Sequence, residues 1–307
     1  MRIVFMGTPE VAAVSLERLF GTPHRVAGVV TQPERPAGRG QKPIASPVGR
    51  AAEGRGVPVL APEKVRDPAF LAALAAWAPE LIVVVAYGRI LPRSILELAP
   101  RGCLNVHYSI LPKYRGAAPA AWAVVNGEEK SGVTTMRLVE KMDAGPIFLQ
   151  REIALAEDET TGSLQAKLAP VGAELLLETI AGIEAGTIAP KAQDESQATL
   201  APMLKKEDGL IDWTLPARAL ERRVRGFNPW PSAYTRVGGS LLKIHRAGVI
   251  EGEKGAPGEV VRAGKDGLWV AAGAGALSLE EVQLENRKKM AAAEFLNGTR
   301  IEKGARL

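Results

Sequence analysis

Leu-Ile-Val-Val-Val-Ala at residues 81–86 is an apolar run without a polar interruption. A strand that is apolar throughout is typical of the centre of a parallel sheet, where helices cover both faces. On either side of this run, short apolar stretches alternate with segments of helical spacing, and this alternation predicts a doubly wound, Rossmann-like α/β sheet. The expected strands are residues 2–6, 26–31, 57–60, 81–86, 103–107 and 133–139, and the expected helices are a segment that opens at Pro9, residues 67–77 and residues 161–183.

The amino-acid composition of the chain changes near residue 186. Residues 186–205 are small, polar and punctuated by proline, which is typical of a linker. Beyond it we expect a helix at residues 215–225 and then five short strands separated by glycine-containing turns, which predict a small antiparallel, OB-like β-barrel. These strands are residues 232–237, 241–250, 259–262, 268–271 and 277–282. The expected division is therefore a Rossmann-like domain at 1–188, a linker at 189–205 and a β-barrel domain at 206–307.

The overall composition is that of a soluble globular protein, with 46% hydrophobic and 24% charged residues in 307. The single cysteine, Cys103, excludes an intrachain disulfide, so the chain needs no oxidising compartment. The first residues lack the pattern of a signal peptide, and the longest apolar run is far too short to cross a bilayer. We therefore expect a cytoplasmic protein that binds no membrane.

The positive charge of the chain is concentrated in its last third. The net charge is +5, and residues 206–307 hold 17 Lys and Arg against 13 Asp and Glu. A solvated basic surface accounts for charge alone, but the excess keeps nucleic acid open as a partner.

Asn105 and His107 are the first candidates for chemistry. The period of two in a strand places Cys103, Asn105 and His107 on one face, near the carboxyl end where open α/β sheets bind ligands. Asparagine is a poor strand former, so its position asks for a reason. The alternative is that both side chains satisfy backbone groups where the strand stops, and these five residues do not decide between the two.

Two further segments favour a functional site. Residues 109–119 form an irregular Pro- and Gly-containing loop directly after the strand, suited to wrap a ligand and offer backbone groups to it. Asp143 follows another expected strand, and a carboxylate beside an imidazole fixes its tautomer and favours its cation. An amide, an imidazole and a carboxylate together suggest acyl or one-carbon transfer.

Other chemistries are less well supported. Cys103 shares the face of His107, but a free cysteine in an apolar run is usually a small core residue. One histidine in the region argues against a metal site. The first turn lacks the G-x-G-x-x-G fingerprint, which disfavours dinucleotide binding.

The motifs MRIVFMGTPEVA, TQPERPAGRGQK, VVVAYGRILP, LNVHYSILPKYRGAAP and MDAGPI together resemble the methionyl-tRNA formyltransferases, a family of folate-dependent formyltransferases. IDW, GFNPWP and KKMAAAEFLNG agree near the other end, so the resemblance covers essentially the whole chain. It implies transfer of the formyl group of 10-formyltetrahydrofolate to the α-amino group of methionine on initiator tRNA, for translation initiation. It implies no metal, and we expect a monomer.

The resemblance also implies roles for particular residues. The catalytic trio maps onto Asn105, His107 and Asp143. The folate contacts map onto Ser109, Ile110, Leu111 and Pro112, with Tyr87 and Gly88 beside the pterin. The loop at 32–47 would enter the acceptor end of the tRNA, and the basic last domain would hold the tRNA backbone. The expected tRNA-binding residues are Arg35, Arg39, Lys42, Lys205 and Lys206.

Two departures from the family and three rival functions remain. Tyr108 stands where relatives usually carry a small residue and could narrow access beside His107, and Pro146 could stiffen the turn after Asp143. The closest rival is a formyltransferase that acts on a small amine, such as an amino sugar nucleotide, which would have no use for the basic loop. A folate hydrolase and a non-catalytic tRNA-binding protein are the others, and the complete trio argues against the last.

Overall fold

The computed structural model describes residues 1–37, 42–265 and 267–307, with the side chains of 35–37, 42 and 43 left aside. It divides into two compact units, each of which is described by itself. The first unit comprises Met1–Pro119, Lys130–Ala154 and Gln165–Pro202, and the second comprises Ala120–Glu129, Leu155–Leu164 and Met203–Leu307. The second unit therefore takes two short segments from the part of the chain that precedes residue 165.

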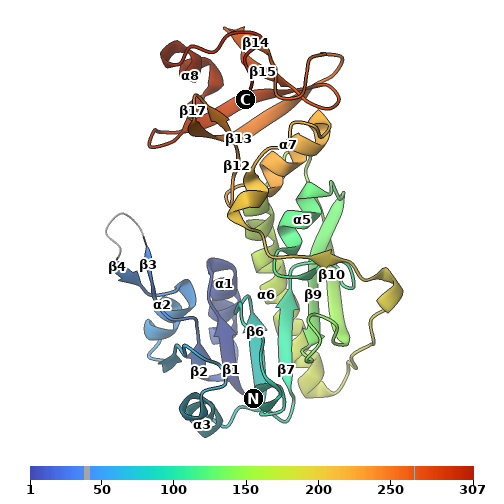
Figure 1. Cartoon of the computed structure of the whole chain (residues 1–307). Coiled ribbons are helices and arrows are strands. Elements are labelled where there is room, and N and C mark those ends of the chain that lie inside the picture. The colour runs from blue at the N-terminus through green and yellow to red at the C-terminus, as the bar shows by residue number, and fades with distance from the viewer. Residues whose placement is uncertain (38–41, 266) are drawn as a thin grey trace. The chain divides into compact units, whose positions relative to one another are not determined.

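A seven-stranded sheet forms the core of the first unit (Figure 1), in the order β10-β9-β7-β6-β1-β2-β5. Its strands are β1 (Arg2–Gly7), β2 (Arg25–Val30), β5 (Val59–Leu60), β6 (Leu81–Val85), β7 (Cys103–His107), β9 (Lys130–Arg137) and β10 (Ile147–Ala154). The five strands from β5 to β7 are parallel, and this confirms the predicted α/β class. Two further strands extend the sheet in the opposite sense, because β9 runs antiparallel to β7 and β10 antiparallel to β9.

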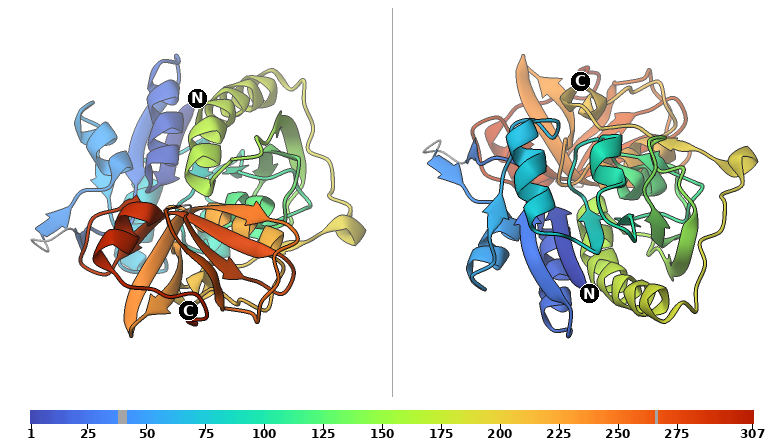
Figure 2. Two further views of the ribbon diagram at one scale, coloured as in Figure 1. Left: turned by 90° about the horizontal axis from the view of Figure 1, so that it is seen from above. Right: turned by 90° about the horizontal axis from the view of Figure 1, so that it is seen from below.

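Alternate residues along each strand direct their side chains to opposite faces of this sheet. Val4, Met6 and Ile82 share a buried cluster with residues of α3 and α4, whereas Val106 faces Gly172 of α6. Figure 2 shows α3 and α6 on opposite sides of the strands. The helices that cover the sheet are α1 (Glu10–Phe20), α2 (Pro47–Glu53), α3 (Pro68–Ala76), α4 (Arg93–Leu96) and α6 (Thr161–Ala185).

The strand order reverses between β1 and β6. The chain leaves β1 toward β2 and β5, and it returns on the other side of β1 through β6 and β7. In an open α/β sheet, this switch point is where the carboxyl ends of the strands leave room for a ligand. Residues after β6 and at the end of β7 are therefore expected to line the site.

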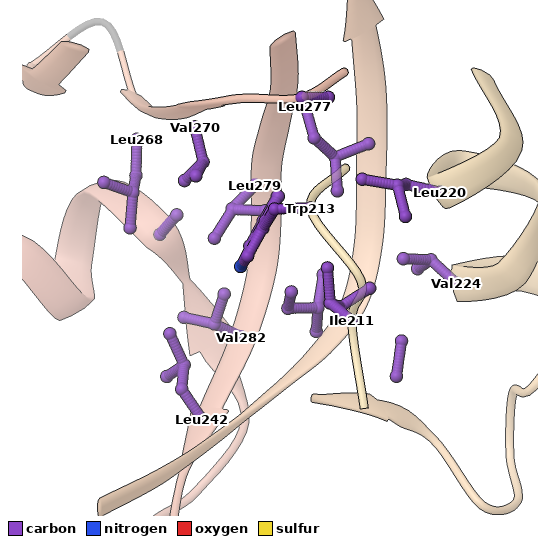
Figure 3. Packing of buried hydrophobic residues seen from close by; sticks show 14 of the residues in the cluster. Ile211, Trp213, Leu220, Val224, Leu242, Leu268, Val270, Leu277, Leu279 and Val282 are labelled. Atoms are coloured by element: carbon purple, nitrogen blue, oxygen red, sulfur yellow. The ribbon is translucent and has the colours of Figure 1, made fainter. Parts of the chain in front are cut away.

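The second unit is built on an antiparallel sheet with the path β12-β13-β16-β15-β14, to which β17 adds beside β16. The strands are β12 (Ala233–Val237), β13 (Ser240–Ile250), β14 (Val260–Gly264), β15 (Gly267–Ala271), β16 (Ala276–Leu284) and β17 (Met290–Ala291), and the helices are α5 (Pro119–Val125), α7 (Ala217–Gly226) and α8 (Ala292–Gly298). Figure 3 shows its core, where Leu220 and Val224 of α7 meet Leu277 of the sheet. The predicted antiparallel sheet with one preceding helix is confirmed.

The segment expected as a linker is held against the first unit. Its strand β11 (Leu200–Ala201) pairs in parallel with β8 (Arg115–Gly116), and Lys191 forms a bridge with Ile147. A 3-10 turn η1 (Glu195–Gln197) lies between these contacts, and a second, η2 (Lys206–Gly209), follows in the second unit. Small polar residues alone did not indicate these hydrogen bonds.

Candidate active site

Strand β7 carries Asn105 and His107 to the carboxyl edge of the sheet. Asn105 lies between Val84 of β6 and Met136 of β9, and His107 is the last residue of the strand. Both side chains are mostly buried, at 8% and 6% exposed. Cys103 shares this face, but its Sγ donates to the Ile95 carbonyl 3.6 Å away in α4. Burial raises the pKa of the Cys103 thiol to about 12, so it remains protonated at neutral pH.

The imidazole of His107 is held by the loop that follows it. Its Nε2 lies 2.9 Å from the carbonyl oxygen of Tyr114. Because a carbonyl only accepts hydrogen bonds, Nε2 carries a proton. Tyr114 has a positive φ of 63° and its N–H donates to Thr199 Oγ1 at 2.9 Å, which fixes where this carbonyl points. The other ring nitrogen, Nδ1, is thereby the atom turned toward Asp143.

Asp143 stands in a turn after β9, with a positive φ of 49°. Its Oδ2 accepts a hydrogen bond from the Gly116 N–H at 2.8 Å and lies 3.8 Å from His107 Nδ1. That separation is longer than a direct hydrogen bond. The structure thus brings together the carboxylate and the imidazole, which lie 36 positions apart in the sequence.

The amide of Asn105 has no hydrogen-bond partner among the residues that the structure describes. Its polar atoms are not sealed from solvent either, because they are absent from the completely buried unsatisfied groups in that same part of the chain. A mostly buried amide without a protein partner is available to a ligand at little cost in internal bonds. Asn105 is therefore free to donate to an oxygen at this edge of the sheet.

Hydrogen bonds from neighbouring residues hold the backbone of the loop at 109–112. Buried Thr134 donates to the Ser109 carbonyl at 2.7 Å and accepts from the Leu111 N–H at 3.1 Å. Gln150 donates to the Leu111 carbonyl at 2.8 Å, and Lys113 N–H donates to the Ile110 carbonyl. The Ser109, Ile110 and Leu111 carbonyls and the Leu111 N–H therefore each have a partner within the protein. The loop forms a rigid wall.

Tyr87 and Gly88 follow β6 at the switch point, as expected. The Tyr87 ring is 2% exposed, and it packs in the apolar cluster under the sheet; burial raises the pKa of its hydroxyl. Its carbonyl accepts from Gln32 Nε2 at 2.9 Å. Gly88 has a φ of 77°, and a Cβ there would lie 2.6 Å from Gln32 Nε2. The backbone of this segment, rather than the tyrosine ring, is what can face a ligand.

The two departures from the family pattern lie differently from expectation. Tyr108 follows the end of β7, and its ring packs beside Val106 against Gly172 of α6 rather than beside His107. Its hydroxyl donates to the Val11 carbonyl of α1 at 3.3 Å, and its ring contacts Gly172. The expectation that Tyr108 narrows access beside His107 is therefore wrong. The Pro146 carbonyl accepts from the Arg137 N–H at 2.9 Å and so ties the turn to the end of β9.

The basic residues expected to bind tRNA lie on two features. Arg35 and Lys42 belong to the paired strands β3 (Arg35–Ala37) and β4 (Lys42–Ile44), and Arg39 lies outside the described residues. Lys205 and Lys206 open the turn η2 in the second unit and are exposed. The structure does not bring these lysines into the same unit as the trio.

Sequence reasoning missed four side chains that hold the site. Thr134 and Gln150 brace the 109–112 loop, and Arg115 and Gln193 lie beside the Asp143 turn. Only Arg115 gave a signal, as an arginine within the Pro- and Gly-rich loop; it is 4% exposed. Gln193 falls in a stretch whose composition indicates a linker, so nothing in the pattern marked it.

The described residues were also considered as metal ligands and as membrane-spanning helices. No group of three or more His, Cys, Asp and Glu side chains is placed to hold a metal ion within the described ranges. None of the helices in that part of the chain has both the length and the hydropathy that a bilayer crossing requires.

Comparison with known proteins identifies the class to which this fold and site belong. The family model described as Formyl transferase matches residues 1–180, and the model described as Formyl transferase, C-terminal domain, matches residues 203–300. The chain belongs to the formyl transferase family. The two matched regions leave residues 181–202 between them, which include the segment held against the first unit.

Individual relatives narrow the similarity within that family. A methionyl-tRNA formyltransferase from Desulfotalea psychrophila is 53% identical over 302 residues, which is 98% of this chain and 94% of that protein. One from Geobacter metallireducens is 47% identical over 307 residues, covering 100% and 98%. The resemblance to methionyl-tRNA formyltransferases that the motifs predicted is thus confirmed. Among solved structures, HypX from Aquifex aeolicus in complex with tetrahydrofolic acid shares the fold, with a TM-score of 0.66 at 20% identity over 99% of this chain and 50% of that one.

Proposed function

We propose that this enzyme transfers the formyl group of 10-formyltetrahydrofolate to the α-amino group of methionine on initiator tRNA, in the cytoplasm and as a monomer. The observation that carries the proposal is the grouping of Asn105, His107 and Asp143 at the switch-point edge of the sheet, with the Asn105 amide unpartnered among the described residues. The near full-length similarity to methionyl-tRNA formyltransferases supports this acceptor. Catalysis is assigned to residues 1–188 and tRNA binding to the basic loop and residues 206–307.

The reaction forms one bond and breaks another. The amine nitrogen attacks the formyl carbon, and the carbonyl electron pair moves onto oxygen to give a tetrahedral oxyanion. Return of that pair expels N10 of the folate, which takes up a proton while the amine loses one. Asn105 Nδ2–H and the protonated Nδ1 of His107 donate to the oxyanion, which concentrates stabilisation where charge develops. No covalent intermediate with the protein is required, in keeping with the protonated, inward-turned Cys103.

The geometry divides the orienting and proton-handling roles. The Tyr114 carbonyl orients the imidazole through Nε2, so His107 presents Nδ1 to the substrate. Asp143 Oδ2 lies 3.8 Å from Nδ1, so the carboxylate and the imidazole can act on the same bound group. We assign Asp143 the tasks of stabilising the imidazolium and of receiving that proton, directly or through a water.

The donor is placed against the braced loop. Ser109, Ile110, Leu111 and Pro112 form a wall beside His107, and the backbone at Tyr87 and Gly88 forms another side at the end of β6. A rigid wall suits a flat pterin, because little ordering is needed when the ring binds. We propose the 10-formyl form of the folate as the donor, so that N10 is the leaving group in the mechanism above.

A competition among acceptors tests the whole proposal. The enzyme is given radiolabelled formyl donor with charged initiator tRNA, charged elongator tRNA, an amino sugar nucleotide or water alone. We expect label on initiator methionyl-tRNA and little on the others. Preferential labelling of the amino sugar nucleotide would establish the small-amine rival, and release of free formate without an acceptor would establish a hydrolase.

The basic loop gives a separate prediction about the acceptor. Arg39 stands between two glycines in a stretch of net charge +2, and its planar guanidinium is suited to a phosphate or a base edge. We expect Arg39→Ala to lower kcat/KM for initiator tRNA strongly while the Kd for folate stays unchanged. Binding of tRNA by the parent enzyme should fall steeply with salt, because several phosphate contacts are expected. The difference between Arg39→Ala and the parent should narrow as salt is raised, because a variant with one phosphate contact fewer has a shallower salt dependence.

Lys42→Ala is the companion variant, and its defect should be milder, because an ammonium lacks the bidentate fork. If Arg39→Ala formylates initiator tRNA as well as the parent enzyme across a salt series, the loop is ordinary solvated surface and another part of the chain selects the acceptor.

A further inference from the structure

A glutamine from the segment between the two family regions holds the turn that carries Asp143. Gln193 Nε2 donates to the Asp143 carbonyl at 2.8 Å and to the Gly145 carbonyl at 2.7 Å. One side-chain amide therefore satisfies two carbonyls on either side of Ala144 and closes the turn around itself.

This turn needs such support because its backbone is unusual. Asp143 adopts a φ of 49°, a conformation that is costly for a residue with a side chain unless the surroundings impose it. Gly145 is packed so closely that a Cβ would lie 1.7 Å from the Arg137 carbonyl oxygen. The turn therefore packs against β9 on one side and is hydrogen-bonded to Gln193 on the other. These contacts restrict the backbone that carries the Asp143 carboxylate.

The side-chain oxygen of Gln193 is in turn hydrogen-bonded to a buried arginine. Its Oε1 accepts from Arg115 Nε at 3.1 Å and from a terminal nitrogen of the same guanidinium at 2.8 Å. With both amide protons used on the turn and its oxygen on Arg115, the glutamine has a fixed orientation.

Glu195 completes the anchor from the same segment. It pairs with Arg115 at 2.8 Å and with Lys141 at 2.7 Å, and these two cations lower the pKa of the Glu195 carboxyl to about 2. The next residue after Arg115 is Gly116, whose N–H holds the Asp143 carboxylate. The backbone and the carboxylate of Asp143 are therefore fixed by one connected set of contacts.

We propose that Gln193 is a positioning residue, which sets the Asp143 carboxylate relative to Nδ1 of His107. This inference rests on the proposed role of Asp143. It assigns to a segment between the two family regions a task in the reaction itself, although Gln193 has no printed contact with His107 and need not touch substrate.

The test replaces the amide by its isosteric acid. In Gln193→Glu the Arg115 contact is kept, but a carboxylate faces two carbonyl oxygens and the turn must move. We expect kcat for formyl transfer to fall about 10- to 100-fold, the scale of a small misplacement of a reacting group. The KM for folate and the Kd for tRNA should stay within about twofold, since neither site is altered. Gln193→Met, of similar length but without polar atoms, should give the same pattern.

Two controls separate positioning from mere stability. Gln197→Glu makes the same chemical change at an exposed glutamine of the same segment, and it should leave kcat unchanged. The pH dependence of kcat in Gln193→Met, which adds no charge, should shift in the same direction as in Asp143→Asn. If Gln193 only stabilises the fold, its substitution should lower the melting temperature and leave the pH dependence of the folded enzyme unchanged.

A double-mutant cycle gives the deciding result. If Gln193 acts through Asp143, adding Gln193→Glu to Asp143→Asn should cost less than about threefold in kcat, because the group being positioned is already disabled. Full additivity of the two losses overturns the inference while leaving the proposed function intact. If Asp143→Asn has no effect on kcat, the proposed role of Asp143 is overturned instead. The two failures are therefore distinguishable.

Discussion

Alanine at Asn105 or at His107 is expected to lower kcat by roughly 10²–10³-fold, the scale for losing one donor to a transition-state oxyanion. Both residues lie at the carboxyl end of β7, and each side chain offers an N–H to a ligand at this edge of the sheet. Single-turnover formyl transfer with saturating folate and initiator tRNA is the measurement, because it isolates the chemical step.

The two variants should differ in stability, and this difference checks the geometry. Asn105→Ala removes an amide without a protein partner in the described chain, so its melting temperature should be nearly that of the parent. His107→Ala removes the buried hydrogen bond between Nε2 and the Tyr114 carbonyl, so its melting temperature should fall further than that of Asn105→Ala. Folate binding should change little in either variant. Near-normal turnover in Asn105→Ala or His107→Ala would remove that residue from the mechanism.

Asp143→Asn should lower kcat by about 10²–10⁴-fold, the range for lost proton-transfer assistance. The substitution is well suited to the site. Asparagine tolerates a positive φ better than most residues, and its side-chain oxygen can still accept from the Gly116 N–H. The loss can therefore be assigned to the missing charge rather than to a disturbed turn.

The pH dependence of the Asp143→Asn enzyme supplies the second measurement. Removing a carboxylate 3.8 Å from an imidazole nitrogen changes the electrostatics that govern the active protonation state, so the pH–kcat curve should move. Glu140→Gln, an exposed carboxylate close in sequence, is the matched control and should leave rate and curve unaltered. An Asp143→Asn enzyme with the parent's rate and pH curve would place this carboxylate outside the reaction.

The parallel part of the fold was predictable because burial on both faces leaves a strong mark. Leu81–Val85 is fully apolar and lies in the middle of the sheet, where the sequence placed it. Strand β10 was not expected. Its exposure alternates along Ile147–Ala154 at the edge of the sheet, and half-exposed edge strands carry a weaker signal. The antiparallel direction of β9 relative to β7 depends on the path of residues 108–129 between them, which composition does not specify.

The candidate site shows a similar limit. Asn105 and His107 could be placed together because strand parity is a local rule. The proximity of Asp143 came only as a suggestion, since it depends on how distant turns pack. The Tyr114 carbonyl and the Gln193 amide could not be predicted at all: one is a backbone atom, and the other comes from a stretch whose composition resembles a flexible connection.

The way the second unit gathers its parts has a consequence for exchanging modules between related enzymes. Residues 120–129 and 155–164 belong to the second unit although they precede the segment at which one would splice. Arg222 of α7 lies so close to Gly127 that a Cβ on that glycine would be 2.1 Å from the guanidinium carbon, and a Cβ on Gly226 would be 2.4 Å from Val125. A chimera joined near residue 200 would set a foreign α7 against these native surfaces. Successful grafts will have to carry all three pieces of the second unit together.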